Sequence, residues 1–257
     1  MSPENALCDL LAARRGIVCA VGAGGKKSVL RAIAAEHRGR VAITGTVPFL
    51  PPPETLPADR FSAEVELLGE QLAAPGAHRI VVFGRPAEKK GRWGGLPPEL
   101  IADWHQRFGF DATLVKADGA RMRWIKAPAE DEPVLPPRCD TLIPVMSARA
   151  LGEPLSDRIA HRVPLVEHVT GCRVGEIFGA EHAARLLASD LGLLKGAGKS
   201  LVRPVINMVD DDERLALAMR TARLALEMTS RFPHVLLMRL KSTTEIVAVA
   251  GREPDAP

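Results

Sequence analysis

The chain has 257 residues but no tyrosine, and aromatic residues make up only 4% of it. Proteins that bind single-stranded nucleic acid stack bases on aromatic side chains, so this composition argues against that class. The charge is also nearly balanced, with 34 Lys and Arg against 31 Asp and Glu and a net charge of +3. A basic surface for nucleic acid needs a larger excess. We therefore expect no nucleic-acid partner.

Cysteine and long apolar runs are also scarce. The four cysteines are dispersed, no two have C-x-x-C spacing, and no Cys/His pair has zinc-ligand spacing. No run of eighteen apolar residues occurs, and the first residues lack the apolar core of a signal peptide. We therefore expect no structural zinc, no membrane span and a cytoplasmic location. The oligomeric state is left open.

Short apolar runs of the kind found in strands recur along the chain. Most are continuous rather than alternating, which is typical of strands buried on both faces of a parallel sheet. Helical patterns lie between them, so we predict an α/β, P-loop-NTPase-like layered fold, with a mostly parallel central sheet flanked by helices. Nothing interrupts the series, and we predict one domain over residues 1–257. The expected strands are Ile17–Val21, Val41–Thr44, Arg79–Phe83, Ala112–Ala117, Thr141–Val145, Val202–Asn207, Val235–Met238 and Ile246–Val249.

The stretch 17–30 is the most informative part of the chain. An apolar run enters a glycine-rich turn, and an amphipathic helical pattern follows. In such a turn, backbone N–H groups and the helix N-terminus attract an anion, a lysine adds a full charge, and a hydroxyl can bind magnesium. We therefore predict that this segment binds the phosphates of ATP or GTP. The residues concerned are Gly22, Ala23, Gly24, Gly25, Lys26, Lys27 and Ser28.

The match to the pattern G-x-x-x-x-G-K-[ST] is incomplete in both possible registers. If Lys26 is the pattern's lysine, Ala20 replaces a glycine and Lys27 replaces the hydroxyl residue. If Lys27 is the lysine, Ser28 supplies the hydroxyl but both glycine positions are lost. A plain glycine turn is the alternative interpretation. A dinucleotide-binding turn is a weaker one, because it needs a third glycine at 27 and an acidic residue after the next strand.

A carboxylate is expected beside this loop. Asp118 follows the predicted strand 112–117 and precedes Gly119. In phosphate-binding enzymes of this architecture, a carboxylate at such a position holds magnesium or its water shell. We predict a magnesium site with Asp118 and a hydroxyl from Ser28 or Thr44. The alternative for Asp118 is an ordinary Asp-Gly turn.

A dense charged segment follows Asp118. Its cations and carboxylates suit a clamp for a charged substrate, although a self-paired surface network is the alternative. His161 and Arg162 follow later, where His161 could move a proton and Arg162 could neutralise developing charge. We take Lys26, Asp118, His161 and Arg162 as candidate catalytic residues. The substrate-loop candidates are Arg121, Lys126, Glu130 and Glu132.

The late strand 202–207 ends in a motif similar to the N-K-x-D pattern by which GTP-binding proteins read the base. Asn207 and Asp210 occupy its first and last positions, and Met208 replaces the lysine. We predict that Asn207 and Asp210 contact the purine. A helix N-cap at Asp210 is the alternative.

In this order along the chain, the segments at 22–26, 117–120, 126–133, 151–152, 161–162 and 207–210 resemble the YqeC family, described as accessory proteins of selenium-dependent hydroxylases. The Asp-Gly-Ala and Lys-Ala-Pro-Ala-Glu segments are the specific part. The resemblance implies a P-loop-type α/β protein that helps to mature selenium-containing molybdenum hydroxylases. Two departures affect predicted magnesium or phosphate contacts: Lys27 stands where the family usually has Thr, and Thr44-Gly45-Thr46 replaces a run of threonines.

Three functions follow as hypotheses. The first is a magnesium-dependent NTPase or phosphotransferase that assists hydroxylase maturation. The second is a non-hydrolysing chaperone or scaffold that holds a nucleotide or the molybdenum cofactor, which Lys27 favours. The third is a small-molecule kinase that uses the segment 121–132 as a substrate clamp. The expected partners are a nucleotide and a molybdenum hydroxylase or its cofactor.

Overall fold

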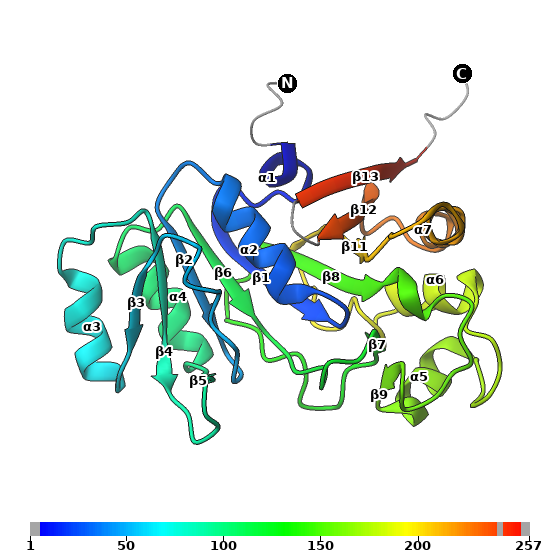
Figure 1. Cartoon of the computed structure of the whole chain (residues 1–257), viewed down its shortest axis with the longest axis horizontal. Helices are drawn as coiled ribbons and strands as arrows, with labels where there is room; N and C mark the ends of the chain where they lie inside the picture. The colour runs from blue at the N-terminus through cyan, green and yellow to red at the C-terminus, as the bar shows by residue number, and fades with distance from the viewer. Residues whose placement is uncertain (1–5, 241–243, 253–257) are drawn as a thin grey trace. The chain divides into compact units, whose positions relative to one another are not determined.

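The structure is a computed structural model that describes residues 6–240 and 244–252, and these residues form two compact units (Figure 1). Unit 1 contains the described residues of Met1–Ala20 together with Lys27–Gly119 and Val134–Thr141. Unit 2 contains Val21–Lys26, Ala120–Pro133 and the described residues from Leu142 onward. Both units consist of mostly parallel strands flanked by helices, so the predicted α/β class is confirmed. The single domain and the P-loop likeness stay predictions.

Unit 1 has the parallel strand order β1-β6-β2-β4-β3, with the short β5 antiparallel to β4. Parallel neighbours need crossover connections, and helices provide most of them. All seven residues of β1 are buried, as expected from its continuous apolar sequence. The elements are α1 Ala6–Leu10, β1 Gly16–Gly22, α2 Lys26–Glu36, β2 Val41–Gly45, β3 Asp59–Ser62, α3 Val65–Ala73, β4 Ile80–Pro86, β5 Trp93–Gly94, α4 Pro98–Arg107 and β6 Ala112–Lys116.

Several of the few aromatic side chains pack together around α4 in unit 1. The ring of Trp104 on α4 lies 5.7 Å from that of Phe83 on β4 and 5.6 Å from that of Phe108. Phe83 also stacks on Phe110 at 6.1 Å. Such pairs contribute about 0.5–1.5 kcal/mol each beyond the burial of their area. The aromatic residues of this helix and its strand therefore serve the core.

Unit 2 contains the parallel strands β8, β11 and β12, with β13 antiparallel to β12 and β10 paired with β8. A separate two-stranded parallel sheet joins β7 and β9. Asp211 caps α7, because its side chain accepts a hydrogen bond from the Arg214 N–H at 2.9 Å. The elements are β7 Ile125–Lys126, β8 Thr141–Ser147, the 3₁₀ turn η1 Ala148–Ala150, β9 Ala160–His161, α5 Val163–Thr170, α6 Ala180–Ala188, β10 Leu201–Val202, β11 Val205–Asn207, α7 Asp212–Met228, β12 His234–Leu240 and β13 Thr244–Gly251.

The structure differs from the sequence-based expectation at several elements. The expected strand 202–207 is divided into β10 and β11, and Pro204, which has no N–H to donate, lies at the break. The strand β3 carries the polar sequence Asp-Arg-Phe-Ser and gave no apolar signal.

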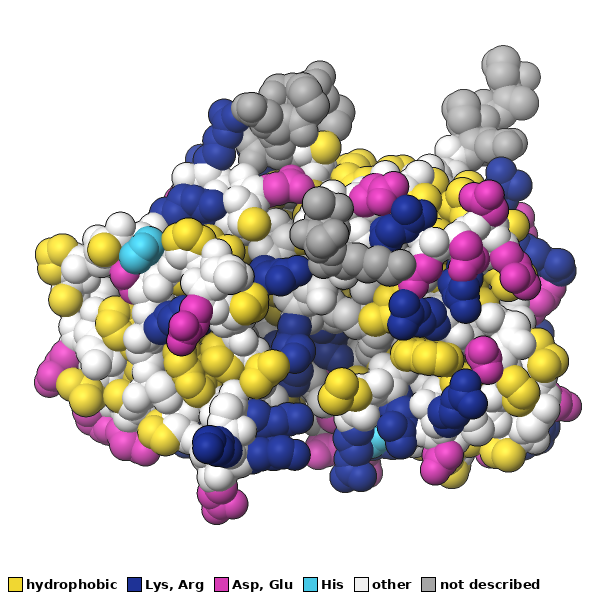
Figure 2. All heavy atoms as spheres, in the orientation of Figure 1, with side chains coloured by type: hydrophobic (Ala, Val, Ile, Leu, Met, Phe, Trp, Pro, Cys, Tyr) yellow, Lys and Arg dark blue, Asp and Glu magenta, His cyan; other side chains and the backbone are white. Residues whose placement is uncertain are grey.

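The helices of unit 2 expose a mixed charged surface. Figure 2 shows Lys and Arg side chains interspersed with Asp and Glu over the region of α6 and α7, and Glu181 of α6 pairs with Arg220 of α7. Exposed pairs of this kind contribute little stability. None of the helices in the described ranges is long and apolar enough to span a membrane.

Candidate functional site

The segment Gly22–Lys26, called the glycine loop below, connects β1 to α2. Strand β1 ends at Gly22 and α2 begins at Lys26, so only Ala23, Gly24 and Gly25 lie between them. The Ala23 N–H donates to the carbonyl of Val145 at 2.8 Å. Within the described ranges, the N–H groups of Gly24 and Gly25 donate no hydrogen bond. Successive N–H groups before a helix N-terminus form a concave site that suits an anion.

Two glycines are required for this path. Gly24 has φ +74°, and a Cβ there would lie 2.6 Å from both the backbone N and the Cβ of Ser147. Gly25 has φ +134°, and a Cβ there would lie 2.1 Å from Nδ2 of Asn207. An L-residue would be strained at these φ values and would also collide with its neighbours. Gly24 and Gly25 can therefore pack against the ends of β8 and β11 only because they carry no side chain.

The two lysines after the glycines differ in their environment. Lys26 is only 5% exposed, and its Nζ donates to the Gly22 carbonyl at the start of the loop. Lys27 is exposed, and Ser28 is half-buried in the first turn of α2. The Lys26 side chain therefore folds back onto the start of the loop, and its role as the lysine of the first sequence register stays a prediction.

Unit 1 contributes the residues predicted to bind magnesium. Strands β1 and β6 are parallel neighbours with Ala20 opposite Lys116, and the Ala117 N–H donates to the Ala20 carbonyl at 3.2 Å. Within unit 1, the β1 residues up to Ala20 therefore lie alongside the end of β6 that leads to Asp118. On the next strand, Thr44 pairs with Val115.

These residues are of the kind that magnesium prefers. Asp118 is 1% exposed, and the buried Thr44 hydroxyl has no hydrogen-bond partner within the described ranges. Carboxylate and hydroxyl oxygens are hard ligands, and magnesium bound with nucleotide takes only one or two protein ligands. The described part of the chain has no cluster of three or more His, Cys, Asp or Glu side chains able to hold a metal. The oxygen donors of Asp118 and Thr44 therefore fit a magnesium ion that takes only one or two protein ligands.

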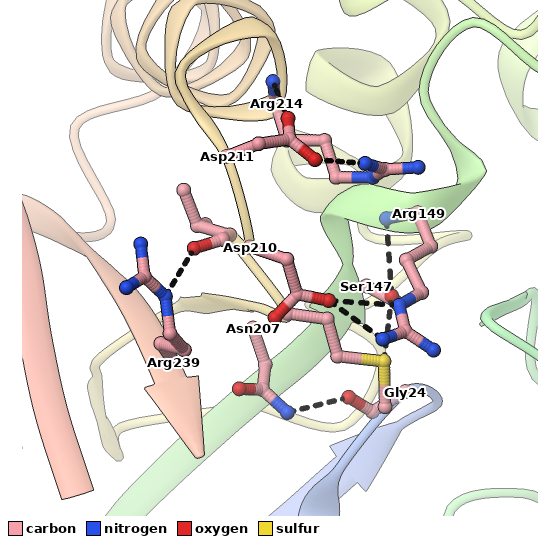
Figure 3. Close-up of polar contacts among 10 residues, drawn as sticks. Gly24, Ser147, Arg149, Asn207, Asp210, Asp211, Arg214 and Arg239 are labelled. Carbon is pink, nitrogen blue, oxygen red and sulfur yellow. Dashed lines mark hydrogen bonds and ion pairs between the residues drawn. The ribbon is translucent and has the colours of Figure 1, made fainter. Parts of the chain in front are cut away.

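Asn207 and Asp210 lie beside the glycine loop in unit 2, and Figure 3 shows their contacts. Asn207 ends β11, and its Nδ2 donates to the Gly24 carbonyl at 3.0 Å. Asp210 accepts from Nε and NH2 of Arg149 at 3.0 and 2.6 Å. The N-cap of α7 is Asp211 rather than Asp210, so the alternative of a cap at Asp210 is off by one residue.

The charged segment and the His-Arg pair meet in unit 2 around one carboxylate. Glu132 accepts from Lys126 Nζ and from Arg162 NH1, both at 2.5 Å, and Lys126 pairs with His161 in the register of β7 and β9. We call Lys126, Glu132, His161 and Arg162 the Glu132 cluster. The Lys126 side chain is fully buried. The cations of this cluster therefore neutralise an internal carboxylate.

The cluster shifts two pKa values. Burial raises the pKa of Glu132, but hydrogen bonds and charge from Lys126 and Arg162 outweigh it and lower the pKa from 4.5 to about 2. Burial lowers the pKa of His161, and the charges of Arg162, Lys126 and Arg121 lower it further. Glu132 is thus ionised and His161 is held towards its neutral form at neutral pH.

Two of the predicted substrate-loop residues lie outside the Glu132 cluster. Arg121 and Glu130 are exposed and make none of the contacts to Glu132. Three residues that sequence reasoning missed contribute instead: Ser147, Arg149 and Lys195. Lys195 donates to the carbonyls of Ala129 and Glu130 at 2.6 and 2.9 Å, which ties down the segment before Glu132. No sequence motif predicted these three residues, because each contacts either a backbone group or a side chain distant in the sequence.

Comparison with known proteins identifies relatives. The model of the family described as YqeC protein matches residues 18–164. A protein of Escherichia coli (strain K12) named "Uncharacterized protein YqeC" is 32% identical over 176 residues, which cover 66% of this chain and 67% of the relative. The family match includes the glycine loop, Asp118 and the whole Glu132 cluster.

Proposed function

The chain belongs to the YqeC family, and from that premise we propose that it is a nucleotide-binding accessory protein that acts as a magnesium-dependent NTPase or phosphotransferase. The observation that carries the proposal is the glycine loop. Its N–H groups at Gly24 and Gly25 donate no hydrogen bond to any residue that the structure describes, and they precede Lys26, whose Nζ donates to the Gly22 carbonyl at the start of the loop. This combination suits a phosphate chain. The role in maturing selenium-dependent molybdenum hydroxylases rests on the family resemblance alone.

Each residue has a proposed task. The N–H groups of the glycine loop bind the β- and γ-phosphates of ATP or GTP, and Lys26 neutralises their charge. Ser28 or Thr44 supplies a hydroxyl to magnesium, and Asp118 orients it. When bound, magnesium supplies Lewis-acid charge to the phosphate oxygens. The chain's own contribution is positioning and electrostatic stabilisation, which provide most of the catalysis in phosphoryl transfer.

Phosphate release measured with magnesium and ATP or GTP tests this function. Asp118→Asn removes the charge but keeps the size of the side chain, and we expect turnover to fall about 100-fold or more. Asp103→Asn on the exposed face of α4 is the matched control and should leave the rate unchanged. A folded Asp118→Asn protein with the normal rate would remove Asp118 from the mechanism.

A second candidate is a protein that binds the nucleotide or a phosphorylated molybdenum cofactor without hydrolysing it. It is favoured by Lys27, which stands in the first turn of α2 where the usual hydroxyl residue is expected. Retained binding of ATP or GTP without phosphate release, in the presence of magnesium, would select this candidate over the first.

The small-molecule kinase is the third candidate. It needs the segment 121–132 to clamp a substrate. Lys126 and Glu132 in that segment bind each other, so only the exposed Arg121 and Glu130 remain among the proposed clamp residues. We therefore rank this candidate below the other two.

A further inference from the structure

Asn207 touches the glycine loop in two ways. Its Nδ2 donates to the Gly24 carbonyl at 3.0 Å, and the same nitrogen fills the space that a Cβ on Gly25 would need, 2.1 Å away. Figure 3 shows the Asn207 amide extended towards Gly24. One side chain therefore fixes the carbonyl of Gly24 and restricts the path of Gly25.

The position of Asn207 is itself fixed. It is the last residue of β11, opposite Ser147 on β8 and Met238 on β12, so parallel strands hold it from both sides. The residue is 1% exposed. A side chain buried at the end of a central strand has little freedom, which makes it a rigid support for the loop.

Asp210, the other half of the base-reading motif, is engaged elsewhere. Both Arg149 contacts end on the same Asp210 oxygen, Oδ2, and the Arg149 N–H donates to Oγ of Ser147 at 3.1 Å. Ser147 Oγ in turn contacts Sδ of Met208 at 3.1 Å. This chain of contacts holds the turn after β11 together. Reading a purine would require the Asn207 amide as a donor and the Asp210 carboxylate as an acceptor. In this structure the Asn207 amide donates to Gly24, and the Asp210 carboxylate accepts from Arg149.

We propose that Asn207 is a positioning residue for the phosphate-binding glycine loop and does not read the base. By fixing the Gly24 carbonyl, it sets the peptide plane that carries the Gly25 N–H, and so presents that donor to a phosphate. The site would then recognise the polyphosphate chain, and Asn207 would not discriminate ATP from GTP. This inference rests on the proposed phosphate site and extends it to the ligand group that is recognised.

Hydrogen exchange tests the positioning role without any ligand. We would compare amide exchange of residues 22–26 in the wild-type protein, Asn207→Ala and the isosteric Asn207→Asp, which lacks the donor. Loss of one hydrogen bond of about 1 kcal/mol predicts roughly fivefold faster exchange of the Ala23 N–H, which donates to the Val145 carbonyl and is the protected reporter next to Gly24.

Thr221→Val is the matched control, because it removes one side-chain hydrogen bond of a buried residue on α7, from the Thr221 hydroxyl to the Leu217 carbonyl at 2.9 Å. Within the described ranges, the Thr221 hydroxyl makes no hydrogen bond with the glycine loop. Unchanged exchange in both Asn207 variants would overturn the proposal.

Binding of three probes then separates loop positioning from base reading. We expect Asn207→Ala and Asn207→Asp to weaken MgATP, MgGTP and magnesium tripolyphosphate by the same factor, with the ATP-to-GTP ratio unchanged. A loss confined to ATP or GTP, with tripolyphosphate binding intact, would show that Asn207 reads the base and would overturn the proposal. If the wild-type protein bound none of the three, the proposed phosphate site would fail. The exchange measurement would still decide whether Asn207 positions the loop.

Discussion

The glycine loop and the Glu132 cluster are both parts of unit 2, and they are built on opposite principles. In the loop, the contacts end on backbone groups: the Asn207 amide on the Gly24 carbonyl, the Val145 carbonyl on the Ala23 N–H and Lys26 Nζ on the Gly22 carbonyl. This leaves the N–H groups of Gly24 and Gly25 unbonded within the described ranges. In the Glu132 cluster, Lys126 and Arg162 both bind one carboxylate.

The difference shows that charge density is a poor guide to a binding site. The segment 121–132 is rich in charges, yet its buried lysine is neutralised inside the protein. The glycine loop is poor in side chains, yet it presents donors that a ligand can use. This contrast is consistent with the proposed phosphate site at the loop and with a structural role of the Glu132 cluster in holding the segment in place.

The largest effect on stability is expected in the Glu132 cluster. Glu132→Gln removes the carboxylate that pairs with the fully buried Lys126. Breaking a buried pair in this way costs about 3–5 kcal/mol in the free energy of unfolding, measurable by urea denaturation. The double variant Lys126→Met/Glu132→Gln should recover part of the loss. A stability loss below about 1 kcal/mol for Glu132→Gln would mean that the cluster is effectively a surface pair.

The next largest effect is expected in the glycine loop. Gly24→Ala adds a Cβ that collides with Ser147 at a left-handed φ. Strain and overpacking together predict a loss of about 2–4 kcal/mol, with loss of nucleotide binding. Gly175→Ala has a similar φ, +84°, but no heavy atom within 4 Å of the new Cβ. Gly175→Ala therefore measures the cost of the backbone strain without the collision. Equal losses of stability in Gly24→Ala and Gly175→Ala would show that the collision with Ser147 contributes nothing.

A pH dependence follows from the lowered pKa of Glu132. Because its pKa is 4.5 when unperturbed and about 2 in the fold, the unfolded chain binds more protons between these values. The stabilisation is complete above pH 4.5 and is lost as the pH falls towards 2. Denaturation at pH 3–5 samples only part of the loss, so the effect is smaller than that of Glu132→Gln. If Glu132→Gln kept the wild-type dependence of the free energy of unfolding on pH, that dependence would come from groups other than Glu132.

The smallest effect is expected at Asp210. Arg149 is 41% exposed at its side chain, so its pair with Asp210 is partly solvated. Asp210→Asn should cost about 1 kcal/mol or less and leave the ratio of ATP to GTP affinity unchanged. A selective loss of GTP binding, measured by calorimetry on the folded variant, would restore the base-reading interpretation.

The sequence predicted the parts of the fold that depend on local pattern. Continuous apolar runs located β1, β2, β4, β6, β8 and β12. The polar strand β3 and the two-residue strands β5, β7 and β9 were not predicted, because their pairing depends on neighbours distant in the sequence. The contacts of Asn207 and of Lys195 were hidden for the same reason: their partners are backbone atoms, which leave no residue pattern.

Calorimetric titration of MgATP and MgGTP into the wild-type protein, Lys26→Ala and Lys27→Ala tests the central claim most directly. Lys26 is buried over the loop and Lys27 is exposed, so the two variants also distinguish the two sequence registers. We predict magnesium-dependent binding that is lost in Lys26→Ala and largely retained in Lys27→Ala. Absence of binding by the folded wild-type protein, or equal binding by Lys26→Ala, would contradict a phosphate site at the glycine loop.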